Sequence, residues 1–366
     1  MSLRRQAFDR PAALPGRSRV GFALAPPRTP RTMTATRSQL RGLVAVLSLS
    51  FLVACSANRL TREEEARQLE IHTETCGSYL NMGEYQRAED QALRGLAIDE
   101  DDFTLNLYLA RALLRQGAVD DILKAEHVLS KLPTDEDFRV PLSLGEILER
   151  KALAQSEAAS GVSSGERYTE APDPEARATE LNEDARRSFE RSLQRYREAL
   201  ELQPNDTEVL NGLVRVTALT GQFEDSLAWC EAVVRITESD RLFWRSHLER
   251  GNISAREEER IWSNIRKLRD LEQAIRLHAA TVLNMELDRP AEAAAELDAI
   301  LAFYPEIPEV HSQKAQILVK LERYEEAIAS IDSYLRLIGH DFDHPDVQRA
   351  YRIRGDCEAA LVRADN

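Results

Sequence analysis

A short residue pattern recurs along this chain in one phase. Each copy has a small residue at a turn, an aromatic residue two positions later and a second small residue three positions further on. The copies are Gly83-Tyr85-Ala88, Gly221-Phe223-Ser226 and, without the turn residue, Tyr324-Ala327. Successive aromatic residues are 138 and 101 residues apart, within two residues of four and three periods of about 34. Landmarks that keep one phase over this distance predict a repeated structural unit.

Between these landmarks the chain has the pattern of helices. Apolar residues recur at steps of three and four, and the alternation of β-branched and polar residues that marks strands is missing. We therefore predict an all-α fold. Its helices have to stack as hairpins, because a single hairpin cannot bury its apolar face alone.

The stretch from Cys76 to Leu96, with Tyr79 inside it, resembles one tetratricopeptide repeat unit. The resemblance implies a right-handed α-solenoid of stacked helical hairpins that ends in a C-terminal capping helix. It also implies that the glycines of the pattern permit the turns. The small residues Ala88 and Ala327 would then lie where two helices approach too closely for a larger side chain.

Turn and cap signals divide the chain further. We expect the array over residues 69–341, in five to six hairpins, and the capping helix and tail over 342–366. An acidic stretch with serine, glycine and proline near 158–182 predicts a loop insertion in the third unit. In the fifth unit a short helix is expected to begin near Trp244. A capping box formed by Ser254 and Glu257 is then expected to start a long helix that ends near residue 287.

The first 54 residues have the composition of a targeting segment. Residues 1–32 are rich in proline and arginine and predict a disordered extension, so Met33 is the better start. Residues 33–54 then form a signal peptide with a basic start and an apolar stretch of 13 residues from Gly42. That stretch is shorter than the roughly 20 residues that cross a bilayer.

The residues Leu52, Val53, Ala54 and Cys55 resemble a bacterial lipobox. The resemblance implies that the Cys55 sulfur carries a lipid and that residues 55–68 form a tether. Ser56 follows the cysteine, which in that family implies sorting to the outer membrane. The alternative is a secreted protein in which Cys55 is incidental.

The net charge of the chain limits the classes of partner that it can bind. The whole chain carries −14, but the segment before Cys55 has nine arginines and one aspartate, so the remainder carries −22. Nucleic-acid affinity requires clustered lysine and arginine, so nucleic acid is not expected as a partner.

In the family that the repeats resemble, partner proteins lie on the concave face lined by the first helix of each hairpin. Counting from the landmarks places eight residues there: Thr73, Gly77, Leu107, Arg111, Asn211, Arg215, Ser312 and Gln316. Arg111, Asn211, Arg215 and Gln316 are the candidate partner contacts. For each one, an ordinary solvated helix residue is the alternative interpretation. The set departs from the arrangement of Lys, Arg and Asn that clamps a C-terminal carboxylate.

No catalytic motif is present, since the sequence lacks HExxH, a glycine-rich phosphate loop, GxSxG and CxxC. We expect no enzyme activity and no cofactor. His72 and Cys76 share a helix face and have metal-ligand chemistry, but core packing explains both. Cys230 and Cys357 are likewise expected to be buried.

The densest polar cluster is His340, Asp341, Asp343, His344 and Asp346. Its imidazoles and carboxylates suit a divalent metal. Capping of a final helix that starts at Pro345 explains the same residues, with Asp343 as the N-cap, and is preferred.

Taken together, these patterns predict a non-catalytic adaptor of the bacterial cell envelope. It would be lipid-anchored to the outer membrane, would face the periplasm and would bind envelope proteins during assembly of a complex. One alternative is a cytoplasmic adaptor with a spurious signal. The other is a metal-dependent enzyme that uses the array to bind its substrate.

Overall fold

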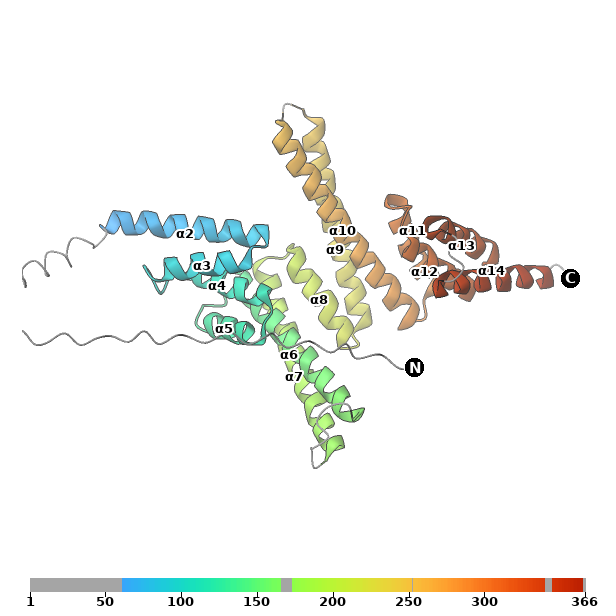
Figure 1. Cartoon of the computed structure of the whole chain (residues 1–366), viewed down its shortest axis with the longest axis horizontal. Coiled ribbons are helices and arrows are strands. Elements are labelled where there is room, and N and C mark those ends of the chain that lie inside the picture. Colours follow the sequence, from blue (N-terminus) through green and yellow to red (C-terminus); the bar gives the residue numbers. More distant parts are fainter. Residues whose placement is uncertain (1–60, 166–172, 252, 340–343, 365–366) are drawn as a thin grey trace, which may run out of the picture. The chain divides into compact units, whose positions relative to one another are not determined.

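The computed structural model describes residues 61–165, 173–251, 253–339 and 344–364. Contacts divide the chain into two units, Met1–Arg62 and Glu63–Asn366, and the fold given below is that of the second unit. Its described residues form thirteen helices and no strand, which confirms the all-α prediction. The helices are α2 (Arg62–Met82), α3 (Tyr85–Leu96), α4 (Phe103–Gln116), α5 (Val119–Leu129), α6 (Arg139–Ser163), α7 (Pro174–Leu202), α8 (Thr207–Leu219), α9 (Phe223–Glu249), α10 (Ala255–Met285), α11 (Pro290–Phe303), α12 (Pro308–Lys320), α13 (Tyr324–Ile338) and α14 (Pro345–Ala364) (Figure 1).

Consecutive helices pair into six hairpins, from α2/α3 to α12/α13, and α14 packs on α13. Each hairpin also packs on the next one through α3/α4, α5/α6, α7/α8, α9/α10 and α11/α12. This stacking is that of an α-solenoid, as the repeat pattern predicted. First helices of neighbouring hairpins also touch directly, α4 with α6 and α6 with α8.

One turn conformation recurs between the two helices of a hairpin. The residue two positions before the second helix has a positive φ at Gly83, Gly117, Gly221, Asp288 and Glu322. Glycine adopts this left-handed conformation without a steric penalty, whereas aspartate and glutamate do so at a cost. The sequence pattern identified the turn residue at Gly83 and Gly221. It identified the third copy, Tyr324-Ala327, without the turn residue, which is Glu322.

The other pattern residues lie at packing positions. Tyr85, Phe223 and Tyr324 begin α3, α9 and α13 and are half-buried. The small residues that follow are Ala88, Ser226 and Ala327, and each is fully buried. In place of an alanine Cβ contact, the Ser226 hydroxyl donates to the Val214 carbonyl oxygen at 2.9 Å.

Two boundary predictions near the array's start are wrong. The tether expected over 55–68 overlaps α2, which begins at Arg62. Three glutamates, Glu63 to Glu65, occupy the first turn of α2, where negative charge favours a helix. The described helices therefore start seven residues before the expected array.

The loop insertion expected over 158–182 is mostly helix. α6 continues to Ser163, and α7 begins at Pro174 after the Asp173 carboxylate caps it by accepting from the Ala176 N–H. Buried small residues, among them Ala159 and Ala178, let these two helices pack closely. The composition that predicts a loop is here that of a tight helical hairpin.

The prediction of a short helix that begins near Trp244 is also wrong, because α9 runs without a break from Phe223 to Glu249. The long helix after it agrees with the prediction within two residues. Its N-cap is Ser254, whose hydroxyl accepts from the Glu257 N–H at 3.2 Å. Because α9 and α10 are 27 and 31 residues long, they pair well beyond the length of an ordinary repeat.

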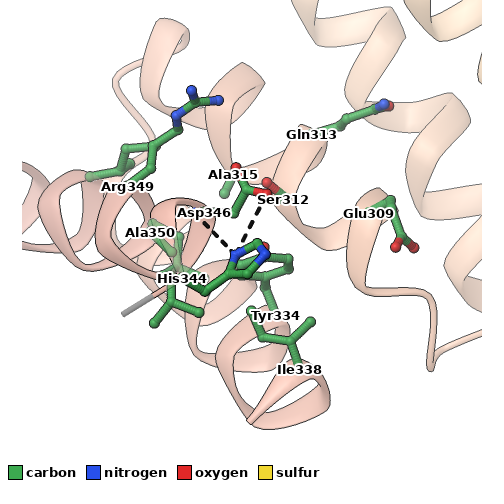
Figure 2. A pocket seen from close by; sticks show the side chains of 13 residues that line it. Glu309, Ser312, Gln313, Ala315, Tyr334, Ile338, His344, Asp346, Arg349 and Ala350 are labelled. Atoms are coloured by element: carbon green, nitrogen blue, oxygen red, sulfur yellow. Dashed lines mark hydrogen bonds and ion pairs between the residues drawn. The ribbon is translucent and has the colours of Figure 1, made fainter. Parts of the chain in front are cut away.

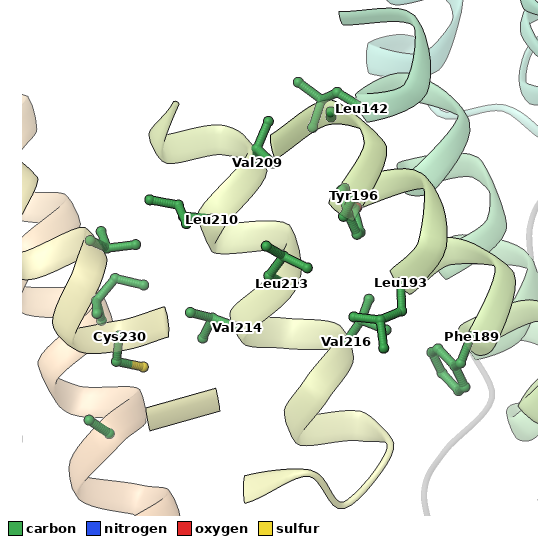
Figure 3. Packing of buried hydrophobic residues seen from close by; sticks show 14 of the residues in the cluster. Leu142, Phe189, Leu193, Tyr196, Val209, Leu210, Leu213, Val214, Val216 and Cys230 are labelled. Atoms are coloured by element: carbon green, nitrogen blue, oxygen red, sulfur yellow. The ribbon is translucent and has the colours of Figure 1, made fainter. Parts of the chain in front are cut away.

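The core cluster with the most buried residues joins five helices, α6 to α10 (Figure 3). Leu213 and Val214 of α8 lie between Leu193 of α7 and Cys230 of α9 in this cluster. Such layers of aliphatic side chains bury the apolar faces that a hairpin alone leaves exposed. In the described part of the chain, no helix has both the length and the apolar character to cross a bilayer.

Candidate partner-binding groove

The first helices of the early hairpins line two adjoining hollows of about 520 and 390 Å³ that share Arg115 and Glu208. We call them together the arginine groove. Its lining residues are Gly77, Leu80, Asn81, Tyr85, Tyr108, Arg111, Arg115, Arg139, Glu146, Glu149, Arg150, Leu153, Glu208, Asn211 and Arg215. Five of these are arginines, so the groove concentrates positive charge in a chain that is acidic as a whole.

Three of the four candidate partner contacts line this groove, namely Arg111, Asn211 and Arg215. Gln316 is exposed on α12 and does not line the groove. Gly77 lines it, and Thr73 of the same helix uses its hydroxyl to donate to a backbone carbonyl.

Leu107 was expected on the concave face, but it is fully buried in the core. The row of α4 that reaches the groove is Tyr108, Arg111 and Arg115, at steps of three and four. Leu107 lies about 100° around the helix from Tyr108 and therefore points into the hairpin stack. Ser312 lines a separate hollow between α12, α13 and α14.

The most buried acid of the groove is Glu149 of α6, which pairs with Arg215 of α8. The guanidinium donates to both carboxylate oxygens, at 2.7 Å from Nε and 2.9 Å from Nη2. Tyr196 of α7 donates its hydroxyl proton to Glu149 Oε2 at 2.6 Å. The Glu149 side chain is 7% exposed, so Arg215 neutralises a buried acid and is not a free contact for a partner.

Tyr196 was missed from the sequence. Its ring is fully buried and lies against Gly145 of α6 and Gly212 of α8. A Cβ at Gly212 would come within 2.5 Å of the ring, so only glycine leaves room for it. Burial and the nearby Glu149 carboxylate raise the pKa of Tyr196, which keeps the hydroxyl protonated as a donor. Glycines in the interior of predicted helices were the available sequence signal.

A weaker set of ion pairs lies beside this one. Glu208 of α8 accepts from Arg111 Nη2 at 3.1 Å and from Arg115 Nη2 at 3.5 Å. Arg115 also pairs with Glu146 of α6 at 3.3 Å. Burial raises the pKa of Glu146, and the Arg115 charge opposes that rise. The Glu208 side chain is 50% exposed, unlike Glu149.

The remaining two arginines also have acceptors within the chain. Arg139 donates to both oxygens of Asp137, and this hydrogen bonding lowers the pKa of the Asp137 carboxyl. Arg150 donates to the carbonyl oxygen of Leu114 at 2.7 Å. Each arginine therefore has an intrachain acceptor, and these acceptors differ widely in burial.

The sequence was compared with models of known protein families, and one of them matches. The tetratricopeptide repeat profile matches residues 78–121, 176–241 and 282–342, which include the α4 and α8 rows of the groove. The chain therefore contains tetratricopeptide repeats. A comparison with curated proteins finds no match.

Several solved structures are similar to this chain at low identity. MamA AMB-1 is 14% identical with a TM-score of 0.35, over 74% of this chain and 92% of MamA. The assembly chaperone of RpL4 (Acl4) is 16% identical with a TM-score of 0.39, over 71% of this chain and 96% of Acl4. Pseudomonas aeruginosa pilF is 12% identical with a TM-score of 0.34, over 82% of this chain and 93% of pilF.

A second group of charges in this tetratricopeptide repeat protein is buried, and we call it the α10 cluster. Glu272 of α10 accepts from Arg241 of α9 at 2.8 Å and from Arg276 at 3.0 Å. Arg276 also pairs at 3.1 and 2.9 Å with two further acids, Glu238 and Glu296. The side chains of Arg241 and Glu272 are 9% and 4% exposed.

The cysteines of the tetratricopeptide array are buried as free thiols. Cys76 donates to the Ala88 carbonyl oxygen, and burial raises its pKa to about 11. Burial likewise raises the pKa of Cys230 to about 12 and raises that of Cys357. His72 pairs with the Gln91 amide at 2.9 Å. High thiol pKa values disfavour the thiolate that metal binding or nucleophilic attack requires.

The hollow between α12, α13 and α14 has a volume of about 520 Å³ (Figure 2). At its edge, His344 Nδ1 accepts from the Asp346 N–H at 3.3 Å and lies 3.8 Å from the Asp346 carboxylate. Pro345 is the first residue of α14, as expected, so His344 holds the N-cap position assigned to Asp343. His340, Asp341 and Asp343 lie outside the described residues. Among described residues, no three potential ligands gather as a metal site.

The predicted targeting features also lie outside the described residues. These are the extension 1–32, the signal peptide 33–54 and the lipobox cysteine Cys55.

Proposed function

We propose that this protein is a non-catalytic scaffold of the bacterial cell envelope that binds partner proteins through the arginine groove. Protein binding accords with the tetratricopeptide fold, in which stacked hairpins form extended binding surfaces. The observation that carries the choice of site is the arginine groove itself. It spans the first helices of successive hairpins and holds half-buried arginines. Arginine and aromatic side chains are common at binding hot spots.

The test is site-specific crosslinking. A photoreactive residue at Asn211, which lines the groove, is expected to capture a defined partner from envelope extracts. The same residue at Gln316, exposed on α12 away from the groove, is the matched control. Capture from Gln316 alone, or identical partners from both positions, would contradict this use of the groove.

We further propose that Cys55 carries the lipid that anchors the protein to the outer membrane, with the array in the periplasm. The support is the lipobox sequence, and the added acyl chains would give stable anchoring. Palmitate labelling of the native chain should disappear in Cys55→Ala. Unlabelled native protein in the cytosol would instead favour the cytoplasmic adaptor.

A further inference from the structure

Glu208 is the one groove acid that the fold does not hold in place. It is the second residue of α8, whose N-terminus is already capped by the Asp206 carboxylate accepting from the Val209 N–H at 2.9 Å. Its carboxylate reaches Arg111 and Arg115 through one oxygen each, at 3.1 and 3.5 Å. These are long contacts for charge-assisted hydrogen bonds. Half of the side chain faces solvent.

The other groove acids are fixed. Glu149 is buried beneath a two-oxygen contact with Arg215 and a hydrogen bond from Tyr196. Glu146 is 13% exposed and held by Arg115. Removing either acid from its cation would leave a buried charge unpaired, which is costly. Moving Glu208 into water costs little, because exposed ion pairs contribute little stability.

Without Glu208, two cations face an open space. Among the described residues, Arg111 would then have no ion pair within 4 Å, and Arg115 would keep Glu146. Two guanidiniums present paired donors that match the geometry of a carboxylate. The hollows on the two sides of Glu208 and Arg115 are bordered by polar and aromatic side chains, including Asn81, Asn211 and Tyr108. A polypeptide can therefore continue in both directions from this point.

We propose that Glu208 occupies the place of a partner's acidic side chain. An acidic segment of the partner lies along the arginine groove, its carboxylate pairs with Arg111 and Arg115, and Glu208 turns into solvent. Glu208 thus competes with the ligand from within the chain. This inference rests on the proposed function, because it names the chemistry of the partner at the same groove.

The space on both sides favours an acidic side chain within a segment over the carboxylate at a chain end. The chain as a whole is negative, so long-range attraction does not assist an acidic ligand. Recognition then depends on the short-range contacts with the two arginines.

The experiment measures peptide binding by the full chain in detergent, using fluorescence anisotropy. The probe is a labelled peptide of alternating glutamate and serine with an amidated C-terminus. A lysine-serine peptide tests charge, and a serine peptide with a free C-terminus tests the chain-end carboxylate. Glu208→Gln removes the competing charge and keeps the side-chain shape, so affinity for the acidic peptide is expected to rise about two- to fivefold.

Two further variants complete the design. Arg111→Gln is expected to reduce binding of the acidic peptide to the level of the lysine peptide. Glu309→Gln changes the second residue of α12, the position on that helix equivalent to Glu208, and is expected to leave affinity unchanged. Thermal unfolding of each variant verifies that the fold is kept.

Three results overturn the proposal. They are an unchanged or lower affinity in Glu208→Gln, no binding of the acidic peptide by any form, and preference for the free C-terminus. Crosslinking from Asn211 separates this failure from failure of the proposed function. A partner captured equally by native, Glu208→Gln and Arg111→Gln chains supports the groove and refutes carboxylate exchange. Absence of a specific partner refutes the proposed function itself.

Discussion

The arginine groove and the α10 cluster are built from the same two types of charged side chain, arginine and glutamate. They differ in how deeply these side chains are buried. In each, one glutamate bridges two arginines, Glu208 in the groove and Glu272 in the cluster. Glu208 is half exposed and Glu272 is 4% exposed. Desolvated charges must keep their partners, whereas exposed charges exchange partners readily. Burial, and not residue type, therefore separates an ion pair that holds helices together from one that is available to a ligand.

The largest effect is expected in the α10 cluster. Glu272→Ala leaves Arg241 buried without its carboxylate and should lower the free energy of unfolding by about 3–5 kcal/mol. Glu238→Ala is the matched control, because Glu238 is 45% exposed and Arg276 keeps its other acids. Urea unfolding followed by circular dichroism measures both. Equal losses in the two variants would show that burial does not govern this cluster.

The next effect concerns the packing beneath the groove. Gly212→Ala places a methyl group against the Tyr196 ring, at 2.5 to 2.8 Å from three ring carbons before any shift. We expect a loss of about 1–3 kcal/mol from overpacking. Gly355→Ala in α14 is the control, since no atom lies within 4 Å of its added Cβ. There alanine should stabilise the helix by roughly 0.5–1 kcal/mol. If Gly212→Ala is neutral in the same unfolding assay, the ring contact is unimportant.

The two ion pairs of Glu208 in the groove should matter less to stability than either of these features. Glu208→Gln is expected to change the free energy of unfolding by less than about 1 kcal/mol, since the Glu208 carboxylate is half exposed and its two contacts are long. Denaturant titration of Glu208→Gln and Glu272→Gln under the same conditions compares their free energies of unfolding directly. A loss in Glu208→Gln that matches the loss in Glu272→Gln would remove the distinction between the two regions.

A smaller, pH-dependent effect is expected at His278 of α10. Burial lowers the pKa of this imidazole, and its Nε2 lies 3.3 Å from the Ser226 hydroxyl. As the pH falls, His278 is therefore protonated in the unfolded state before it is protonated in the folded state. The stability contribution is complete above about pH 6.5 and is lost as the pH falls through the lowered pKa. Between about pH 7.5 and about pH 5.5, the melting temperature of the native chain should fall more than that of His278→Gln. If the melting temperatures of the two chains fall equally with pH, His278 does not contribute to the pH dependence.

Local signals made much of the fold predictable. Pro290 and Pro308 mark helix starts, and Ser254 provides a cap that could be recognised without tertiary information. The repeat phase then assigned these helices to hairpins. The end of α6 and the start of α7 were predicted as a loop insertion, because their small and polar residues are also those of loops. Packing of the two helices against each other makes these residues helical.

The groove was predictable in position but not in detail. Repeat phase placed Arg111, Asn211 and Arg215 on one face, and all three line the groove. It could not show that Arg215 is committed to Glu149, because that pair depends on Tyr196 reaching them from another helix. Side-chain partners between distant helices follow from the assembled fold and not from spacing along the chain.

The buried Tyr196 has a mechanical consequence. Stacked hairpins bend when neighbouring units slide over each other, since each unit touches its neighbours alone. This tyrosine starts on α7, fits against Gly145 of α6 and Gly212 of α8, and ends on the Glu149 carboxylate. Sliding of the third hairpin over the fourth would drive the Gly212 backbone into its ring. The junction beneath the groove is thereby locked, and bending of the array is left to its other junctions.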